Sequence, residues 1–144
     1  MSVAYSRHRL LLYYKGNISA LTLFAQQNGS VCFPEALPPL SVALEEDETA
    51  FGKVSVHPAV LVNAINVGMQ FPNDLLSVEP GFCEQVDAPG GAITVHMARF
   101  NLLDPPHKLL QSRNCFLKTL PELRGSAPAE LELLRRAYIK VMEG

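Results

Sequence analysis

The sequence predicts an α/β domain in which a mixed sheet is combined with two principal helices, one central and one C-terminal. Short apolar runs separated by turn residues indicate strands. The stretch His57–Phe71 contains no carboxylate, lysine or arginine and follows a helical pattern, and apolar residues at helical spacing predict a second helix at residues 127–142. With 144 residues, the chain suits a single domain spanning residues 1–144.

The first third of the chain predicts a strand followed by a β-hairpin. An apolar run at residues 9–14 ends at the turn-forming triplet at residues 15–17. Asn28-Gly29 lies between two further apolar runs, and both residue types tolerate the positive φ of a tight hairpin turn. Residues 18–34 are therefore predicted as a hairpin. Residues 18–25 also fit helical spacing, and a short helix is the alternative for them.

The middle of the chain predicts an irregular segment that leads into the central helix. Three prolines within residues 34–39 remove backbone donors and fix φ, and the acidic run Glu45–Glu48 has the composition of a loop or a helical turn. Proline suits a first helical turn, so the helix is expected to begin at His57-Pro58 and to reach about Met69, with Gly68 weakening its end.

The second half predicts a long hairpin, a short strand and the terminal helix. Residues 75–86 and residues 92–103 read as strands joined by a Gly-rich turn. Pro80-Gly81 interrupts the first of these strands and predicts a bulge or bend. Residues 114–119 form a further short apolar run before the helix at residues 127–142.

The order of these elements resembles the Nudix hydrolase fold, and this resemblance implies an α/β/α sandwich. Residues 33–37, Phe-Pro-Glu-Ala-Leu, stand where the family has its Leu-Pro-Gly-Gly entry. Residues 46–50 resemble the Gly-Glu-Thr step before the family's helix, and Gly68 matches the glycine that closes it. Residues 94–100 resemble the core strand that follows. The similarity covers most of the chain as architecture.

The family's catalytic motif is degenerate in this sequence. With Gly68 as the closing glycine, the family's essential acids and their neighbours are replaced by Asp47, Lys53, Leu61, Val62, Ile65 and Asn66. The family hydrolyses nucleoside diphosphate derivatives with Mg²⁺ or Mn²⁺, and such hard ions need several oxygen ligands from one helix face. The resemblance therefore implies a member that has kept the fold and has neither catalytic residues nor a metal cofactor.

The leading functional hypothesis is a non-enzymatic, cytoplasmic domain that binds a small ligand or another protein. Glu84, His96 and Arg99 are the candidate ligand-binding residues, and a nucleotide bound without hydrolysis beside Glu84 and His96 is a weaker version of this hypothesis. The charge-free helix is expected to pack against the sheet, or to bury its excess apolar face in a homodimer.

The alternative is a divergent pyrophosphohydrolase with relocated carboxylates. In this alternative, Glu45, Glu46 and Glu48, with Glu84, would hold Mg²⁺ or Mn²⁺ in place of the helix. Neighbouring side chains in a run of four acids diverge, so a solvated loop is the commoner interpretation. A second set of charges forms a candidate basic strip for a phosphate or an acidic partner: Arg99, Lys108, Arg113 and Lys118.

Composition excludes other classes of function. The net charge of −2 and the pI near 6.1 argue against a surface for a nucleic-acid polymer. No apolar run approaches the roughly 18 residues of a membrane span. Cys32, Cys83 and Cys115 are odd in number and include no Cys-x-x-Cys pair, which predicts reduced thiols and favours the cytoplasm.

Overall fold

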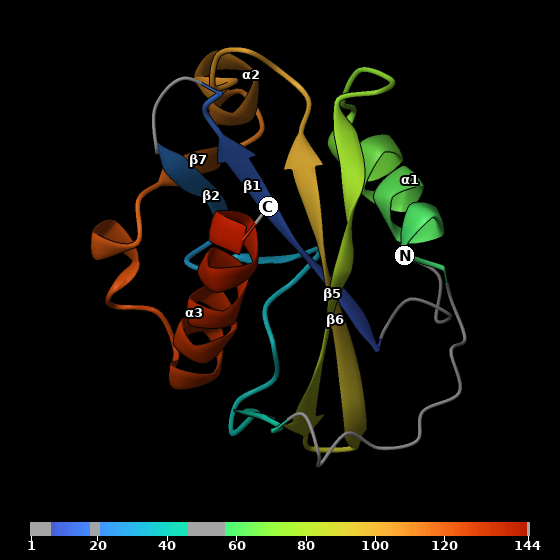
Figure 1. Ribbon diagram of the computed structural model, residues 1–144. Helices are drawn as coiled ribbons and strands as arrows, with labels where there is room; N and C mark the ends of the chain where they lie inside the picture. Colours follow the sequence, from blue (N-terminus) through green and yellow to red (C-terminus); the bar gives the residue numbers. More distant parts are fainter. Residues whose placement is uncertain (1–6, 18–20, 46–56, 144) are drawn as a thin grey trace.

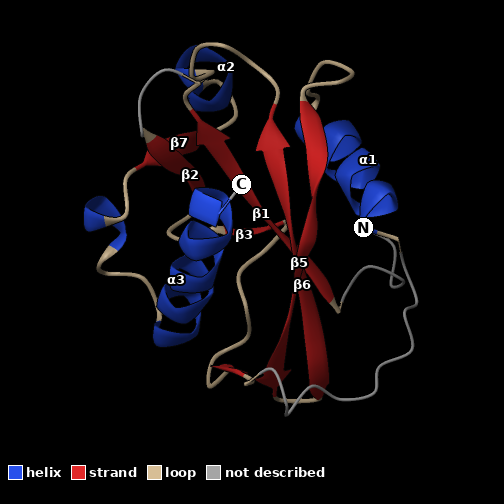
Figure 2. Ribbon diagram, viewed as in Figure 1, coloured by secondary structure: helices blue, strands red, loops and turns tan. Residues whose placement is uncertain are grey.

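The computed structural model describes residues 7–17, 21–45 and 57–143, in which a mixed sheet carries helices on both faces (Figures 1 and 2). The predicted α/β class is confirmed. The strands are β1 (His8–Lys15), β2 (Thr22–Gln27), β3 (Cys32–Phe33), β4 (Val42–Ala43), β5 (Leu76–Ala88), β6 (Gly91–Phe100) and β7 (Cys115–Lys118). The helices are α1 (Pro58–Met69), α2 (His107–Gln111), the 3₁₀ helix η3 (Pro121–Leu123) and α3 (Pro128–Glu143).

Strand β1 lies at the centre of the sheet. The strand order is β4-β5-β6-β1-β2-β7, and β3 also pairs with β1. β1 and β6 run parallel, while the other pairs are antiparallel. A central strand is covered on both faces, which explains why the run His8–Tyr14 is buried throughout.

Alternating residues of β1 feed two separate hydrophobic cores. Leu10 and Leu12 pack with α1 and α2 on one face, whereas Leu11 and Tyr13 pack with α3 on the other. α1 contributes the stripe Leu61, Val62 and Ile65, and α3 contributes the stripe Leu133, Leu134, Ala137 and Val141. The face turned toward α1 is called the α1 face below, and the opposite one the α3 face.

The boundaries of α1 agree with the prediction of a helix that begins at His57-Pro58 and ends near Met69. The Nδ1 atom of His57 accepts a hydrogen bond of 3.0 Å from the backbone N–H of Ala59 and so caps the first turn. The helix continues through Gly68 and ends at Gln70, whose left-handed backbone (φ 55°, ψ 45°) turns the chain back toward the helix.

The predicted irregularity at Pro80-Gly81 is a bulge that changes which side chains of β5 face each helix. Val78 pairs with Ala98 and Cys83 pairs with His96, so residues 79–82 stand opposite a single residue of β6. Even-numbered residues before the bulge face α1, and even-numbered residues after it face α3. The residues of β5 that face α1 are therefore even-numbered before the bulge and odd-numbered after it.

The predicted hairpin at residues 18–34 is correct at its turn and wrong in its second arm. Gln27 and Ser30 exchange backbone hydrogen bonds of 2.8 and 3.0 Å across Asn28-Gly29, where both residues have positive φ. After Ser30 the chain leaves β2, and β3 pairs with β1 instead. Glu130 of α3 accepts hydrogen bonds from the Ser30 hydroxyl and from the backbone N–H of Val31, which holds the departing chain over the α3 face.

Other differences from the predicted elements are small. The alternative of a helix at residues 18–25 is wrong for the described part, because β2 begins at Thr22. β6 ends at Phe100 and does not extend to residue 103. The short elements β4, α2 and η3 were not expected from the sequence. In the part of the chain that the structure describes, no helix is both long enough and apolar enough to cross a membrane.

Candidate functional site

A cavity of about 550 Å³ lies between α1 and the first residues of β1, beside β3. The strand side of its wall is formed by His8, Arg9, Leu10 and Phe33, followed by Pro34. The helix side is formed by one flank of α1, including Val60, Asn63, Ala64, Val67 and Gly68. Most of these groups are apolar, and the lining contains no carboxylate among the described residues. The cavity is called the α1 cavity below.

Helix α1 borders this cavity with a second apolar flank. Its apolar side chains extend beyond the part of the helix that packs against the sheet. Leu61, Val62 and Ile65 are buried against the sheet. Val60 and Val67 lie on another flank, where they are 42% and 71% exposed. A helix that packs on only one side normally carries polar residues on the rest of its surface. The second flank of α1 therefore leaves apolar side chains exposed beside the cavity.

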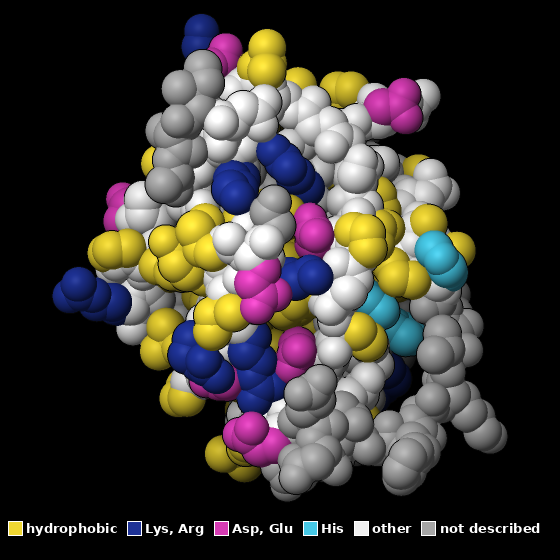
Figure 3. Space-filling model, viewed as in Figure 1, with side chains coloured by type: hydrophobic (Ala, Val, Ile, Leu, Met, Phe, Trp, Pro, Cys, Tyr) yellow, Lys and Arg dark blue, Asp and Glu magenta, His cyan; other side chains and the backbone are white. Residues whose placement is uncertain are grey.

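Two histidines lie together on the α1 face, next to the cavity. His8 of β1 and His96 of β6 have parallel rings whose centroids are 6.5 Å apart and whose planes differ by 12°. Both side chains are buried, and His8 belongs to the cavity wall. Figure 3 shows histidine side chains on the α1 side of the molecule, while acidic and basic side chains are interspersed over α3.

The surroundings of this pair favour neutral imidazoles. Burial lowers the pKa of His8, and the neighbouring Arg9 charge lowers it further. Burial also lowers the pKa of His96, with smaller contributions in the same direction from His8 and from His57 at the start of α1. A hydrogen bond to the backbone of Phe82 opposes this shift in His96. Both rings are therefore uncharged near neutral pH.

The structure does not bring the predicted ligand-binding residues Glu84, His96 and Arg99 to one site. His96 lies on the α1 face, opposite Cys83 of β5. Glu84 is the next residue after Cys83 and pairs with Val95, so it points to the opposite, α3 face, where it contacts Arg136. Arg99 also lies apart from His96, and its Nη2 atom donates 3.3 Å hydrogen bonds to the carbonyl oxygen of Lys15 and to Oδ1 of Asn17. A nucleotide groove beside Glu84 and His96 is not formed.

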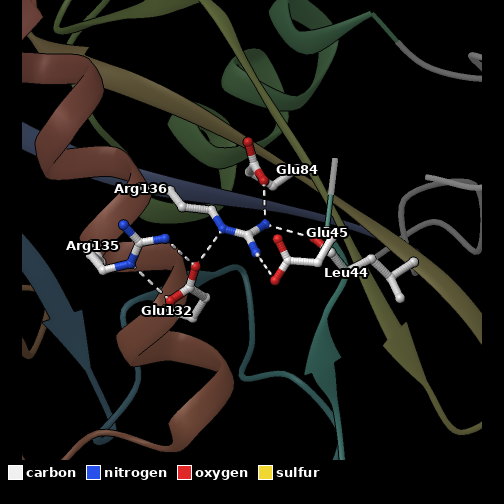
Figure 4. Close-up of polar contacts among 6 residues, drawn as sticks. All are labelled: Leu44, Glu45, Glu84, Glu132, Arg135 and Arg136. Carbon is white, nitrogen blue, oxygen red and sulfur yellow. Dashed lines mark hydrogen bonds and ion pairs between the residues drawn. The ribbon is translucent and has the colours of Figure 1, made fainter. Parts of the chain in front are cut away.

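Glu84 is instead part of an ion-pair network centred on Arg136 of α3 (Figure 4). The Nη1 atom of Arg136 contacts Glu84 Oε1 at 2.5 Å and donates to the carbonyl oxygen of Leu44 at 2.7 Å. Its Nε atom donates to Glu132 at 2.7 Å, and its Nη2 atom lies 3.9 Å from Glu45. This network joins α3 to β5 and to the segment that follows β4.

The same network bears on the alternative of relocated metal ligands. Glu45 and Glu84 both contact the Arg136 guanidinium, which occupies the position that a shared cation would need. Glu46 and Glu48 lie outside the described residues. Across residues 7–17, 21–45 and 57–143, no group of three or more His, Cys, Asp or Glu side chains is arranged to hold a metal ion.

Of the residues that the predicted resemblance would place at the family's motif positions, Asp47 and Lys53 lie outside the described residues and the others lie on α1. Leu61, Val62 and Ile65 are all less than a tenth exposed within the core on the α1 face. The side-chain oxygen of Asn66 is buried without a hydrogen-bond partner. The inner surface of α1 is thus an apolar contact with the sheet.

The predicted basic strip is divided among separate structural contacts. The Arg113 guanidinium donates hydrogen bonds of 2.7 and 2.8 Å to the carbonyl oxygens of Met69 and Gln70, where it caps the C-terminal end of α1. Arg99 holds the end of β1 as described above. Lys108 lies on α2 and Lys118 on β7.

His8 and the α1 cavity were not predicted from the sequence. A histidine at the start of the apolar run of β1 was the available signal for a buried polar group. The chain matches no protein-family model and no curated protein sequence.

Proposed function

We propose that the protein is a non-catalytic ligand-binding domain of Nudix type, and that the α1 cavity holds an uncharged, largely apolar small molecule. The observation that carries this proposal is the cavity itself. Its volume of about 550 Å³ falls within the range of sites for small organic ligands, which are mostly apolar and contain a few polar groups. His8, Arg9 and Asn63 are polar residues of this kind in its wall.

The assignment to a Nudix-type fold is supported by the order of the elements and by the position of α1. Helix α1 follows the acidic run in the sequence and precedes the β5–β6 hairpin, as the resemblance implies. The non-catalytic character is supported by the apolar residues Leu61, Val62 and Ile65 on the inner surface of α1. The Arg136 contacts of Glu45 and Glu84 give the relocated-metal alternative less support.

The binding proposal is tested with N-phenyl-1-naphthylamine, an uncharged dye that fluoresces in apolar surroundings. We expect saturable binding, and we expect Ala64→Phe to weaken it at least about tenfold because the larger ring fills the cavity. Ala59→Phe is the matched control, since Ala59 lies on α1 outside the cavity lining. Dye binding that is unchanged by Ala64→Phe, or no binding at all, would contradict the proposal.

Two further measurements separate this proposal from its alternatives. Metal-dependent turnover of a nucleoside diphosphate derivative that Glu46→Gln abolishes would establish the divergent hydrolase. Sedimentation velocity tests the homodimer. A dimer whose formation excludes the dye would assign the exposed flank of α1, with Val60 and Val67, to an interface between two copies.

A further inference from the structure

We propose that the protein binds a small organic carboxylate in a second pocket, where Arg99 and Asn17 meet at the carboxyl ends of β6 and β1. This pocket has a volume of about 260 Å³ and lies at the opposite end of β1 from the α1 cavity. The two pockets share no lining residue, so the inference does not depend on the proposed function. The second pocket is called the Arg99 pocket below.

The parallel pairing of β1 and β6 brings Arg99 and Asn17 together. Arg99 pairs with Tyr13 of β1 in the parallel register and with Ser77 of β5 on its other side. β1 and β6 end at the same edge of the sheet (Figure 1), so the turn after β1 lies beside the loop after β6. The backbone of Arg99 is thus fixed between two strands, and its side chain reaches the edge where Asn17 lies.

The Arg99 guanidinium has donors that the described part of the protein does not use. Its Nη2 atom makes hydrogen bonds of 3.3 Å to the carbonyl oxygen of Lys15 and to Oδ1 of Asn17, and both are longer than is usual for N–H donors. Across residues 7–17, 21–45 and 57–143, its Nε and Nη1 atoms have no acceptor. Within the same ranges, Arg99 is in no ion pair. A charged group with open donors therefore borders the pocket.

The other wall of the Arg99 pocket is the loop after β6, which is fixed in place by hydrogen bonds. The backbone N–H of Asn101 donates to the carbonyl oxygen of Leu75 at 2.8 Å, and the Tyr14 hydroxyl donates to the carbonyl oxygen of Leu103. Leu102 and Leu103 line the pocket and remain 43% and 79% exposed. The pocket therefore combines a cation with apolar side chains on a loop that is held at both ends.

Carboxylates close to this edge are directed to other partners. No carboxylate lines the pocket among the described residues. Glu79 accepts a hydrogen bond from the Tyr13 hydroxyl and forms no ion pair with Arg99. Asp74 contacts the Asn101 side chain through its backbone carbonyl oxygen. The charge of Arg99 is therefore available to an anion that enters from solvent.

These groups fit a ligand with one negative charge and a compact apolar body. A carboxylate accepts charge-assisted hydrogen bonds from a guanidinium, and one guanidinium balances its single charge. The Nδ2 atom of Asn17 has no acceptor among the described residues and supplies a second donor at the same edge. A phosphate dianion would leave one charge uncompensated beside leucine side chains, which disfavours it.

The test is a titration of isotope-labelled protein with benzoate, followed through the backbone amide signals of residues 101–103 in NMR spectra. Benzamide has nearly the same shape without the charge, and benzylamine carries the opposite charge. We expect saturable shifts with benzoate and at least about tenfold weaker binding of benzamide, because a hydrogen bond to a charged group contributes this much. Benzylamine should cause no saturable shift.

Two pairs of variants assign the binding to the pocket. Arg99→Gln should weaken benzoate binding about tenfold, whereas Lys108→Gln removes an exposed cation outside the lining and should not. Leu103→Asp places a carboxylate at the exposed rim and should also weaken binding. Leu40→Asp adds the same charge at a leucine that is 89% exposed and outside the lining, so it is the matched control. If Arg99→Gln changes the fold, the two leucine variants decide.

Every other outcome contradicts the assignment. The proposal is overturned if benzoate causes no saturable shift, if benzamide binds equally well, or if Arg99→Gln and Leu103→Asp both leave binding unchanged. An equal loss in Lys108→Gln would show attraction to surface charge in general. Benzoate that displaces N-phenyl-1-naphthylamine would lie in the α1 cavity, which overturns this proposal and leaves the proposed function standing. Benzoate binding that depends on Arg99, in a protein that does not bind the dye, would contradict the proposed function alone.

Discussion

Arg136 shows how one side chain can set the roles of several others. Its side chain is 13% exposed, and its guanidinium contacts Glu84, Glu132 and the carbonyl oxygen of Leu44. Glu132 accepts hydrogen bonds from Arg135 and Arg136, and these contacts lower its pKa to about 2 against the opposing effect of burial. Charges that resemble a functional cluster in the sequence thus hold α3 against the sheet.

Removal of Arg136 should therefore destabilise the fold. We expect Arg136→Met to lower the free energy of unfolding by about 2 kcal/mol, because Glu84 and the Leu44 carbonyl lose their partner in a partly buried site. Arg135→Met is the control, since Arg135 is 60% exposed and its pair with Glu132 should contribute less than about 0.5 kcal/mol. Urea unfolding measures both variants, and equal losses would contradict the assigned role of Arg136.

At the same scale, the sequence predicted the strands that carry Glu84 and His96, but it did not predict that the two side chains point to opposite faces of the sheet. Alternation along an uninterrupted hairpin allows residues of two strands to be assigned to faces. The Gly-rich turn predicted a hairpin, yet it could not say which two residues would close it. Ala88 pairs with Gly91, and the register counted from this turn places Glu84 opposite Val95 and Cys83 opposite His96, so Glu84 and His96 point to opposite faces.

Among the elements, α1 was the most accurately predicted from the sequence. A proline after His57 and a long run without charges sufficed, because both helix ends are set by local geometry. The cavity beside it was not predictable in this way. Its strand wall depends on Phe33 and Pro34, which reach this position only because β3 pairs with β1 after leaving the hairpin turn. Such long-range pairing leaves no local signal in the sequence.

The two glycines that interrupt predicted elements should respond oppositely to alanine. A Cβ at Gly68 meets nothing within 4 Å and the residue is helical, so we expect Gly68→Ala to stabilise the protein by about 0.5–1 kcal/mol. Gly81 has φ of 85°, and a Cβ there would approach the Lys140 side chain to 2.8 Å. We expect Gly81→Ala to destabilise by at least about 1 kcal/mol.

Thermal unfolding of the two glycine variants gives the sign of each change. A destabilising Gly68→Ala would show that α1 requires the flexibility of glycine near its end. A neutral Gly81→Ala would show that the β5 bulge can form with another backbone geometry. Either result would remove the physical reason given for that glycine.

At the scale of the whole molecule, the two cores on opposite faces of the sheet differ in their chemistry. The core on the α3 face is bordered by the Arg136 network, in which opposite charges are paired. The core on the α1 face is bordered by the His8–His96 pair and by a charge-free helix. Protonation should therefore affect the attachment of α1 at a higher pH than the attachment of α3.

Acid should destabilise the protein in two separate steps. The pKa values of His8 and His96 are lowered by burial, so the unfolded chain binds more protons than the folded protein just below the unfolded value of 6.5. The free energy of unfolding should then decrease as the pH falls from 6.5 toward the lowered values. Glu132 has a depressed pKa of about 2, so its stabilising contribution is complete above 4.5 and is lost between 4.5 and about 2.

Urea unfolding at a series of pH values, with the His8→Gln/His96→Gln variant beside the wild type, separates these steps. The first decrease should be absent from the variant, because glutamine does not titrate, while the decrease below pH 4.5 should remain. Arg136→Met should instead reduce the second decrease, because Glu132 loses one of its donors. A first decrease of the same size in the histidine variant would show that other groups control the acid response, and α1 would then not be the part of the fold that protons loosen first.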